Sequence, residues 1–225
     1  GISNGLAKYN EEANADGSSA PKILYTEGES ESAIYAVRSA GINPATGQEV
    51  FIKKNGAWTL EYDLNDKVVV GDTEPWLKGA FFPMLSYKGW QMTLAFEYNF
   101  GGQIYNLTRA KNVENVNPRN NVDRRAFEQR WKNVNDVPPY LDIANASDRE
   151  NYHTSRFVED DNNVICRNIE LSYEFNSEIL KKAGFKRLRI SAGMKDPFRM
   201  STVKFERGTD YPFSRGFTFS ISPTF

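Results

Sequence analysis

The sequence predicts an all-β fold of antiparallel strands, and three observations support that prediction. Several stretches alternate apolar and polar residues with the period of two that is typical of strands. Aromatic residues make up 13% of the chain although its mean hydropathy is -0.59, a combination that suits sheets with one apolar and one polar face. Finally, the connections between the longest predicted strands alternate between short turns and long polar segments.

Residues 1–76 are predicted to form an irregular region of loops and short strands. Residues 1–32 are rich in Gly, Ser, Asn and Glu and show no sustained period, which indicates loops. Short apolar stretches follow at 34–37, 50–52 and 58–62, separated by turn residues. Because a strand needs about 9 to 11 residues to cross a bilayer, we expect these stretches to lie outside one.

Residues 77–225 contain five stretches that are long enough to cross a bilayer, at 79–87, 90–100, 164–175, 186–194 and 216–225. The clearest of them alternates without a break from Trp90 to Phe100, and Pro83 in the preceding stretch marks an edge or a bulge. Glu97 lies on the polar face, as do Arg187 and Arg189 of a later strand. Such charges are stable in a water-filled lumen and costly in a dry core, which favours a barrel over a packed sandwich.

Arg167 is an exception to this alternation, because it falls on the apolar parity of the strand 164–175. Three interpretations are open at this stage. The side chain extends to the rim of a membrane, or it follows a β-bulge, or it counts against a barrel.

The connections predict the orientation of the strands. Short turns at 87–90 and 176–185 alternate with long loops at 106–153 and 195–213, the asymmetry of outer-membrane barrels with short periplasmic turns and long external loops. One helix is predicted within the first long loop, with Asn121 as its N-cap. The last strand then runs toward the periplasm, and we expect the ring of Phe225 to lie at the inner aromatic girdle. We also expect the apolar residues of this strand to act as the C-terminal signal for barrel assembly; they are Phe217, Phe219, Ile221 and Phe225.

Composition excludes several functions. The net charge of -1 disfavours nucleic-acid binding, and a single cysteine, Cys166, with a single histidine, His153, leaves no disulfide framework, metal site or cofactor site to predict. Glu170 and Glu174 share one face of a strand, but nothing in the sequence would raise the pKa of one above the other, so we predict no enzyme. No apolar run is long enough for a transmembrane helix.

Three segments resemble a known family in order and spacing: WLKGAFFPMLSYKGWQMTLAFEYNFGGQIYN, RFVEDDNNVICRNIELSYEF and FKRLRISAG with the terminal strand. Together with the upstream AGINPATGQEVF, they resemble the C-terminal end of the SusC/RagA family of TonB-linked outer-membrane transporters. The resemblance implies a barrel of about 22 strands filled by an N-terminal plug. It also implies energy supply from the TonB complex, a SusD-like surface lipoprotein as partner, outer-membrane lipid around the barrel, and glycan or peptide import. Since five strands cannot close such a barrel, we expect this chain to be the C-terminal part of a longer one, not a self-contained domain.

If substrate is held between external loops, the candidate contacts are loop residues that combine a ring with a polar end: Tyr105, Trp131, Tyr140 and Tyr152. The alternative function is a soluble or surface-displayed all-β ligand-binding module, in which the same strands form a sandwich. That alternative predicts that Glu97, Arg187 and Arg189 face bulk solvent and that the protein is soluble without detergent.

Overall fold

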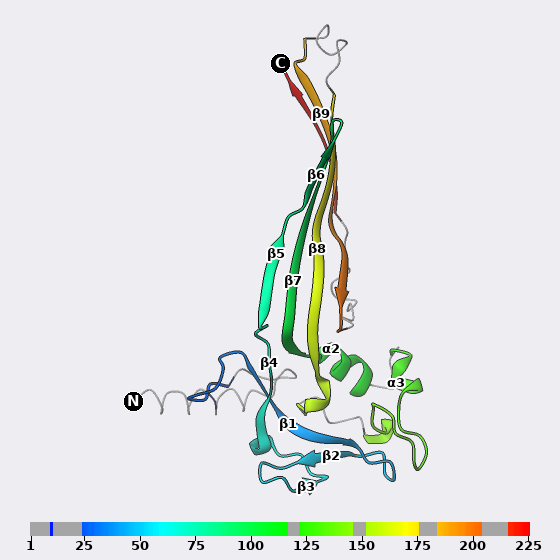
Figure 1. Cartoon of the computed structure of the whole chain (residues 1–225). Helices are drawn as coiled ribbons and strands as arrows, with labels where there is room; N and C mark the ends of the chain where they lie inside the picture. Colours follow the sequence, from blue (N-terminus) through cyan, green and yellow to red (C-terminus); the bar gives the residue numbers. More distant parts are fainter. Residues whose placement is uncertain (1–9, 11–23, 117–121, 146–151, 176–183, 204–215) are drawn as a thin grey trace. The chain divides into compact units, whose positions relative to one another are not determined.

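The structure, a computed structural model shown in Figure 1, describes residues 10, 24–116, 122–145, 152–175, 184–203 and 216–225. The chain divides into two compact units. Unit 1 comprises Gly1–Glu74 and Gly102–Asp160, and unit 2 comprises Pro75–Gly101 and Asp161–Phe225.

Unit 2 is built on one antiparallel sheet with the strand order β10-β9-β8-β7-β5, and β6 also pairs with β7. Figure 1 shows the longest strands side by side. The strands are β5 (Leu77–Phe81), β6 (Met84–Tyr87), β7 (Trp90–Tyr105), β8 (Val158–Phe175), β9 (Arg187–Ser201) and β10 (Phe217–Thr224). The predicted all-β class and antiparallel pairing are confirmed.

The interruption predicted at Pro83 separates β5 from β6, which pair with successive parts of β7. The backbone N–H of Leu94 donates to the carbonyl of Pro83 at 3.0 Å, so β7 keeps a partner across the gap. The following turn is tight, as predicted. Lys88 and Gly89 have φ values of 46° and 89°, and two positive φ angles in a two-residue loop are typical of a type I′ hairpin turn.

Strand β9 is longer than the sequence predicts. The alternation predicts an end at Met194, whereas β9 continues to Ser201 and moves the start of the following connection from 195 to 202. Asp196, with a φ of 47°, and Pro197 break the pattern locally. Phe198 then resumes the ladder opposite Cys166 of β8. Most of the predicted turn 176–185 and residues 204–215 of the predicted loop lie outside the described residues.

Unit 1 contains a four-stranded sheet with the order β3-β2-β1-β4. Its strands are β1 (Ala33–Ile42), β2 (Glu49–Ile52), β3 (Trp58–Thr59) and β4 (Lys67–Asp72). The first three match the predicted short strands, although β1 is longer and β3 shorter than expected, and β4 was not predicted. Ala36, Val37 and Phe51 are almost fully buried and form part of the interior of this unit.

Residues 106–157, between β7 and β8, have a hydrophobic cluster of their own. The segment contains two short helices, α2 (Leu107–Arg109) and α3 (Arg125–Glu128), and the π-helical turn η2 (Ala110–Glu114). It also contains the 3₁₀ turns η3 (Ile143–Asn145) and η4 (Ser155–Phe157). Outside this segment, a further 3₁₀ turn, η1 (Leu64–Asp66), precedes β4. The cluster consists of Ala110, Val113, Val116, Ala126, Tyr140 and Phe157.

The helix predicted in this segment is shorter than expected. α3 is a single turn with Arg124 at its N-cap, and the predicted cap, Asn121, lies outside the described residues. The carbonyl of Ala126, which would bond the N–H of residue 130 in a longer helix, accepts instead from the Arg130 side chain at 2.5 Å. This bond ends the helix after one turn.

Candidate functional site

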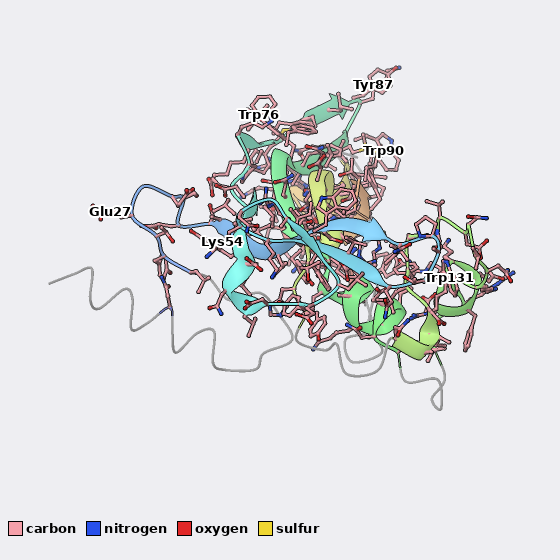
Figure 2. All side chains as sticks on the ribbon, turned by 90° about the horizontal axis from the view of Figure 1, so that it is seen from below. Glu27, Lys54, Trp76, Tyr87, Trp90 and Trp131 are labelled. Atoms are coloured by element: carbon pink, nitrogen blue, oxygen red, sulfur yellow. The ribbon has the colours of Figure 1, made fainter. Side chains whose placement is uncertain are left out.

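One face of the sheet in unit 2 exposes large apolar side chains. The strand register places on this face Leu77, Phe81, Leu85, Tyr87, Trp90, Leu171, Phe175, Ile190, Phe198, Phe217, Phe219 and Ile221, all of them exposed. Rings meet across strands, with centroid distances of 4.8 Å for Phe81–Phe96 and 4.8 Å for Trp90–Tyr173. In Figure 2, Tyr87 points away from the strands. An exposed apolar face of this extent is typical of an interaction surface, and of the lipid-facing side of a barrel wall.

The predicted assembly signal lies on this apolar face. Phe219 is 80% and Ile221 69% exposed, and Phe217 is exposed in the same row of β10. Phe225 follows the strand and contacts Phe185 at a ring distance of 5.0 Å. The register places Phe217, Phe219 and Ile221 on one face, and the role of the four residues in assembly stays a prediction.

The opposite face of the sheet carries polar and charged side chains that pair across strands. Arg167 donates from Nε to Glu97 at 2.7 Å, and its Nη1 lies 3.3 Å from an oxygen of Asp196. The register of β8 and β9 shifts between Cys166 and Asn168, so a bulge turns Arg167 to the polar face. Of the three interpretations of Arg167, the β-bulge is confirmed.

Arg189 is held on the same polar face by neutral groups. It donates to Ser172 Oγ at 3.0 Å and to Gln91 Oε1, while the neighbouring Arg187 lies 3.9 Å from Glu174. Arg189, Ser172, Gln91 and Glu174 border an open cavity of about 590 Å³ next to the tight turn at 87–90. An arginine with such polar neighbours is typical of a surface in contact with water, as the lumen of a barrel is.

Two of the predicted ligand contacts lie together within unit 1. Tyr140 is 2% exposed, belongs to the cluster of residues 106–157, and accepts a hydrogen bond from Arg109 Nε at 2.8 Å. Tyr105 packs against the same cluster, with its ring edge-on to Phe157 at 6.0 Å. In this arrangement both rings stabilise the segment between β7 and β8.

The other two predicted contacts lie elsewhere in unit 1 and are half-buried. Trp131, labelled in Figure 2, donates from Nε1 to the carbonyl of Pro44 at 2.8 Å, and its ring lies against Gly47. Tyr152 stacks on Tyr62 with a centroid distance of 4.1 Å and an interplanar angle of 10°. A ligand contact of any of the four stays a prediction.

Tyr62 has a strongly shifted ionisation. Its hydroxyl accepts from the backbone N–H of His153 at 3.1 Å, and the ring also contacts Phe51. Burial raises the pKa of Tyr62 to about 12, so the hydroxyl is neutral at all physiological pH values.

Unit 1 contains a buried ionic cluster that sequence analysis did not predict. Glu49 of β2 and Glu114 of η2 are each 2% exposed and both contact Arg156 of η4. Burial lowers the pKa of Arg156, but the two carboxylates outweigh burial and raise it. Burial raises the pKa of Glu114 in spite of Arg156. Since all three residues are common on surfaces, no pattern in the sequence could have predicted their burial.

The structure offers no metal centre in its described part: no group of three or more His, Cys, Asp or Glu side chains there is placed to hold an ion. Among the described helices, none combines the length and apolar character that spanning a membrane requires.

No protein-family model matches the chain. TonB-dependent receptor P39 of Formosa agariphila is 29% identical to it over 166 residues, which are 70% of this chain and 15% of the receptor. TonB-dependent receptor P3 of the same organism is 27% identical over 144 residues, or 64% of this chain and 14% of that receptor. The chain is related to the TonB-dependent receptors. It spans about a seventh of the length of these two relatives.

Solved structures show where this fold has been seen before. The RagAB peptide importer in its open-open state superposes with a TM-score of 0.67 and 18% identity over 86% of this chain and 22% of that one. A second structure of the RagAB peptide transporter gives a TM-score of 0.60 with 18% identity, over 76% of this chain and 19% of that one. The two curated relatives and these folds together support the resemblance to SusC/RagA-type receptors that the sequence motifs indicated.

Proposed function

We propose that this chain is the C-terminal barrel segment of a TonB-dependent outer-membrane importer of glycans or oligopeptides. The observation that supports the proposal is the sheet of unit 2, which has an exposed apolar face and an ion-paired polar face. In a multi-pass barrel of the outer membrane, the first face contacts lipid and the second borders a wet lumen. Such a protein acts by binding and gating, and no bond chemistry is assigned to it.

The proposed topology follows the strand pattern. Within residues 77–225 the chain crosses the membrane five times. β5 and β6, which pair with successive parts of β7, together form one of these crossings. The short turns at 87–90 and 176–185 face the periplasm. Residues 1–76 and the connections between β7 and β8 and between β9 and β10 lie outside the cell, where a SusD-like lipoprotein binds. The TonB complex acts on parts of the importer that lie outside these residues.

The proposed substrates belong to one of two classes, glycans or oligopeptides. The solved structures are described as a peptide importer, whereas the names of the curated relatives state no substrate. Trp131 and Tyr152 are the better placed of the predicted contacts, because both are only half-buried, whereas Tyr140 is buried and the hydroxyl of Tyr105 is enclosed. A ring face suits a sugar ring or an apolar side chain of a peptide.

The experiment is a clean deletion of the full-length gene in the source bacterium, followed by uptake of fluorescent oligopeptides and oligosaccharides. We expect uptake of one class to fall and to return with the wild-type gene, and the protein to require detergent for extraction from the outer membrane. Unchanged uptake of both classes together with solubility in the absence of detergent would contradict the proposal. That result would favour the soluble or surface-displayed binding module.

A further inference from the structure

The buried ionic cluster joins three segments of unit 1 that are distant in sequence. Glu49 comes from β2, Glu114 from η2 and Arg156 from η4. The side chains of both carboxylates are 2% exposed and that of Arg156 is 11% exposed. These charges therefore have little contact with water, and the ion pairs and hydrogen bonds within the cluster must compensate for the lost hydration.

The two carboxylates are held in different ways. Glu49 binds the guanidinium as a fork, with Oε1 2.7 Å from Nε and Oε2 3.0 Å from Nη2 of Arg156. Glu114 accepts from Arg156 only at Oε1, where the distance to Nη2 is 2.5 Å. Its Oε2 is buried and has no hydrogen-bond partner. A buried carboxylate oxygen without a partner is costly, and the cost is largest while the group is ionised.

The other charged group that faces Glu114 does not compensate its carboxylate by a direct bond. Arg130 donates to the backbone carbonyls of Val113 and Glu114, and also to those of Ala126 and Leu141. Four of its N–H donors are thus directed at the main chain. Arg156 is the cation in contact with the Glu114 carboxylate, and Arg156 is already matched by Glu49.

We propose that Glu114 is a proton-binding site of the folded protein and that the packing of unit 1 responds to pH through it. A proton from solvent binds Oε2, while Oε1 continues to accept from Arg156. The pair Glu49–Arg156 then remains balanced and the third group is neutral. Both oxygens of Glu49 remain engaged by Arg156. The direction of the pKa shift of Glu114 agrees with this geometry, since burial raises it.

The response to pH has a definite sign. In the unfolded chain Glu114 loses its proton near the ordinary carboxyl pKa, whereas in the folded chain it keeps the proton to higher pH. The folded state therefore binds more protons in this interval, and the stability of unit 1 falls as pH rises through the raised pKa of Glu114. For one proton, the opening equilibrium constant increases by up to about tenfold per pH unit. Mild acid holds β2, η2 and η4 together, and higher pH loosens them.

The experiment is amide hydrogen exchange of the full-length protein in detergent over a pH series, with each rate referred to the intrinsic rate at that pH. Peptides covering 110–116 and 152–157 report on the cluster, and a peptide within 91–97 of β7 serves as an internal reference. In the wild type we expect exchange at the cluster to rise with pH relative to the reference. Glu114→Gln keeps an acceptor for Arg156 and carries no charge, so its relative exchange should stay flat and match the wild type in acid.

Glu49→Gln is the matched control, because it removes the fork that balances Arg156. This variant should exchange faster than the wild type at neutral pH, because it leaves the buried guanidinium of Arg156 without its forked partner. Faster exchange of Glu114→Gln than of the wild type at neutral pH would overturn the proposal, since it would mean that the ionised carboxylate stabilises the fold. A wild-type profile without relative pH dependence would overturn it as well, even if neither variant folds.

Discussion

The substitution Phe219→Arg tests the apolar face of β10 at the point where a charge should cost most. Phe219 is 80% exposed and stands five residues from Thr224, the last residue of the strand. With a rise of about 3.4 Å per residue and a tilt of about 40°, this places it about 13 Å from the strand end, near the middle of an apolar band about 25 Å tall. An arginine on the lipid face at the midplane costs about 2–4 kcal/mol, or a folding equilibrium lower by about 30- to 700-fold.

The assay is urea unfolding of the full-length protein in lipid vesicles, with the folded fraction measured by heat-modifiable mobility on gels. Ser220→Arg places the same charge one residue further on, toward the polar face, and Phe225→Arg places it at the rim. We expect each of these controls to cost about 0–1 kcal/mol. Equal losses at 219 and 220, or no loss at 219, would refute the assignment of this face to lipid.

Three further predictions concern assembly and unit 1. Deletion of Phe225 should lower the amount of folded barrel in the outer membrane, and an unchanged yield would count against its role in the assembly signal. Gly47→Ala places a Cβ 2.6 Å from the Trp131 ring at a φ of 68° and should lower the free energy of unfolding by about 1–3 kcal/mol. Gly28→Ala is the control, because its φ of 89° is also positive but nothing lies within 4 Å, and it should lower the free energy of unfolding by only about 1 kcal/mol. Arg130→Met leaves four buried carbonyls without their donor and should destabilise unit 1 by at least about 3 kcal/mol, seen as faster hydrogen exchange at 110–116; wild-type exchange rates would contradict this.

The strands of unit 2 could be predicted because their chemistry repeats with the pleat. Along β7, each residue faces one of two different environments, so the alternation from Trp90 to Phe100 determines both the element and its faces. The bulge at Arg167 was one of three possible interpretations, since a single residue on the wrong parity does not show where the register shifts. The extension of β9 was missed because Asp196 and Pro197 interrupt the pattern before Phe198 resumes it.

Unit 1 was much less predictable, because tertiary contacts decide its structure. Arg130 ends α3 through its side chain and buries itself against four carbonyls, which a propensity argument would not anticipate. Tyr140 was predicted as a candidate ligand contact in a loop, but it packs in a local core whose other residues come from positions 110 to 157. The cluster of Glu49, Glu114 and Arg156 likewise depends on three segments that meet only after folding.

The central claim is that one face of β10 contacts lipid and the other contacts water. The most direct test is electron paramagnetic resonance of the full-length protein in vesicles, with a spin label placed in turn at each position from 217 to 222 in a Cys166→Ser background. We predict that oxygen, which partitions into lipid, relaxes labels at 217, 219 and 221 more strongly, and that a water-soluble nickel complex relaxes labels at 218, 220 and 222 more strongly. Equal access of the nickel complex to all six positions would contradict the account.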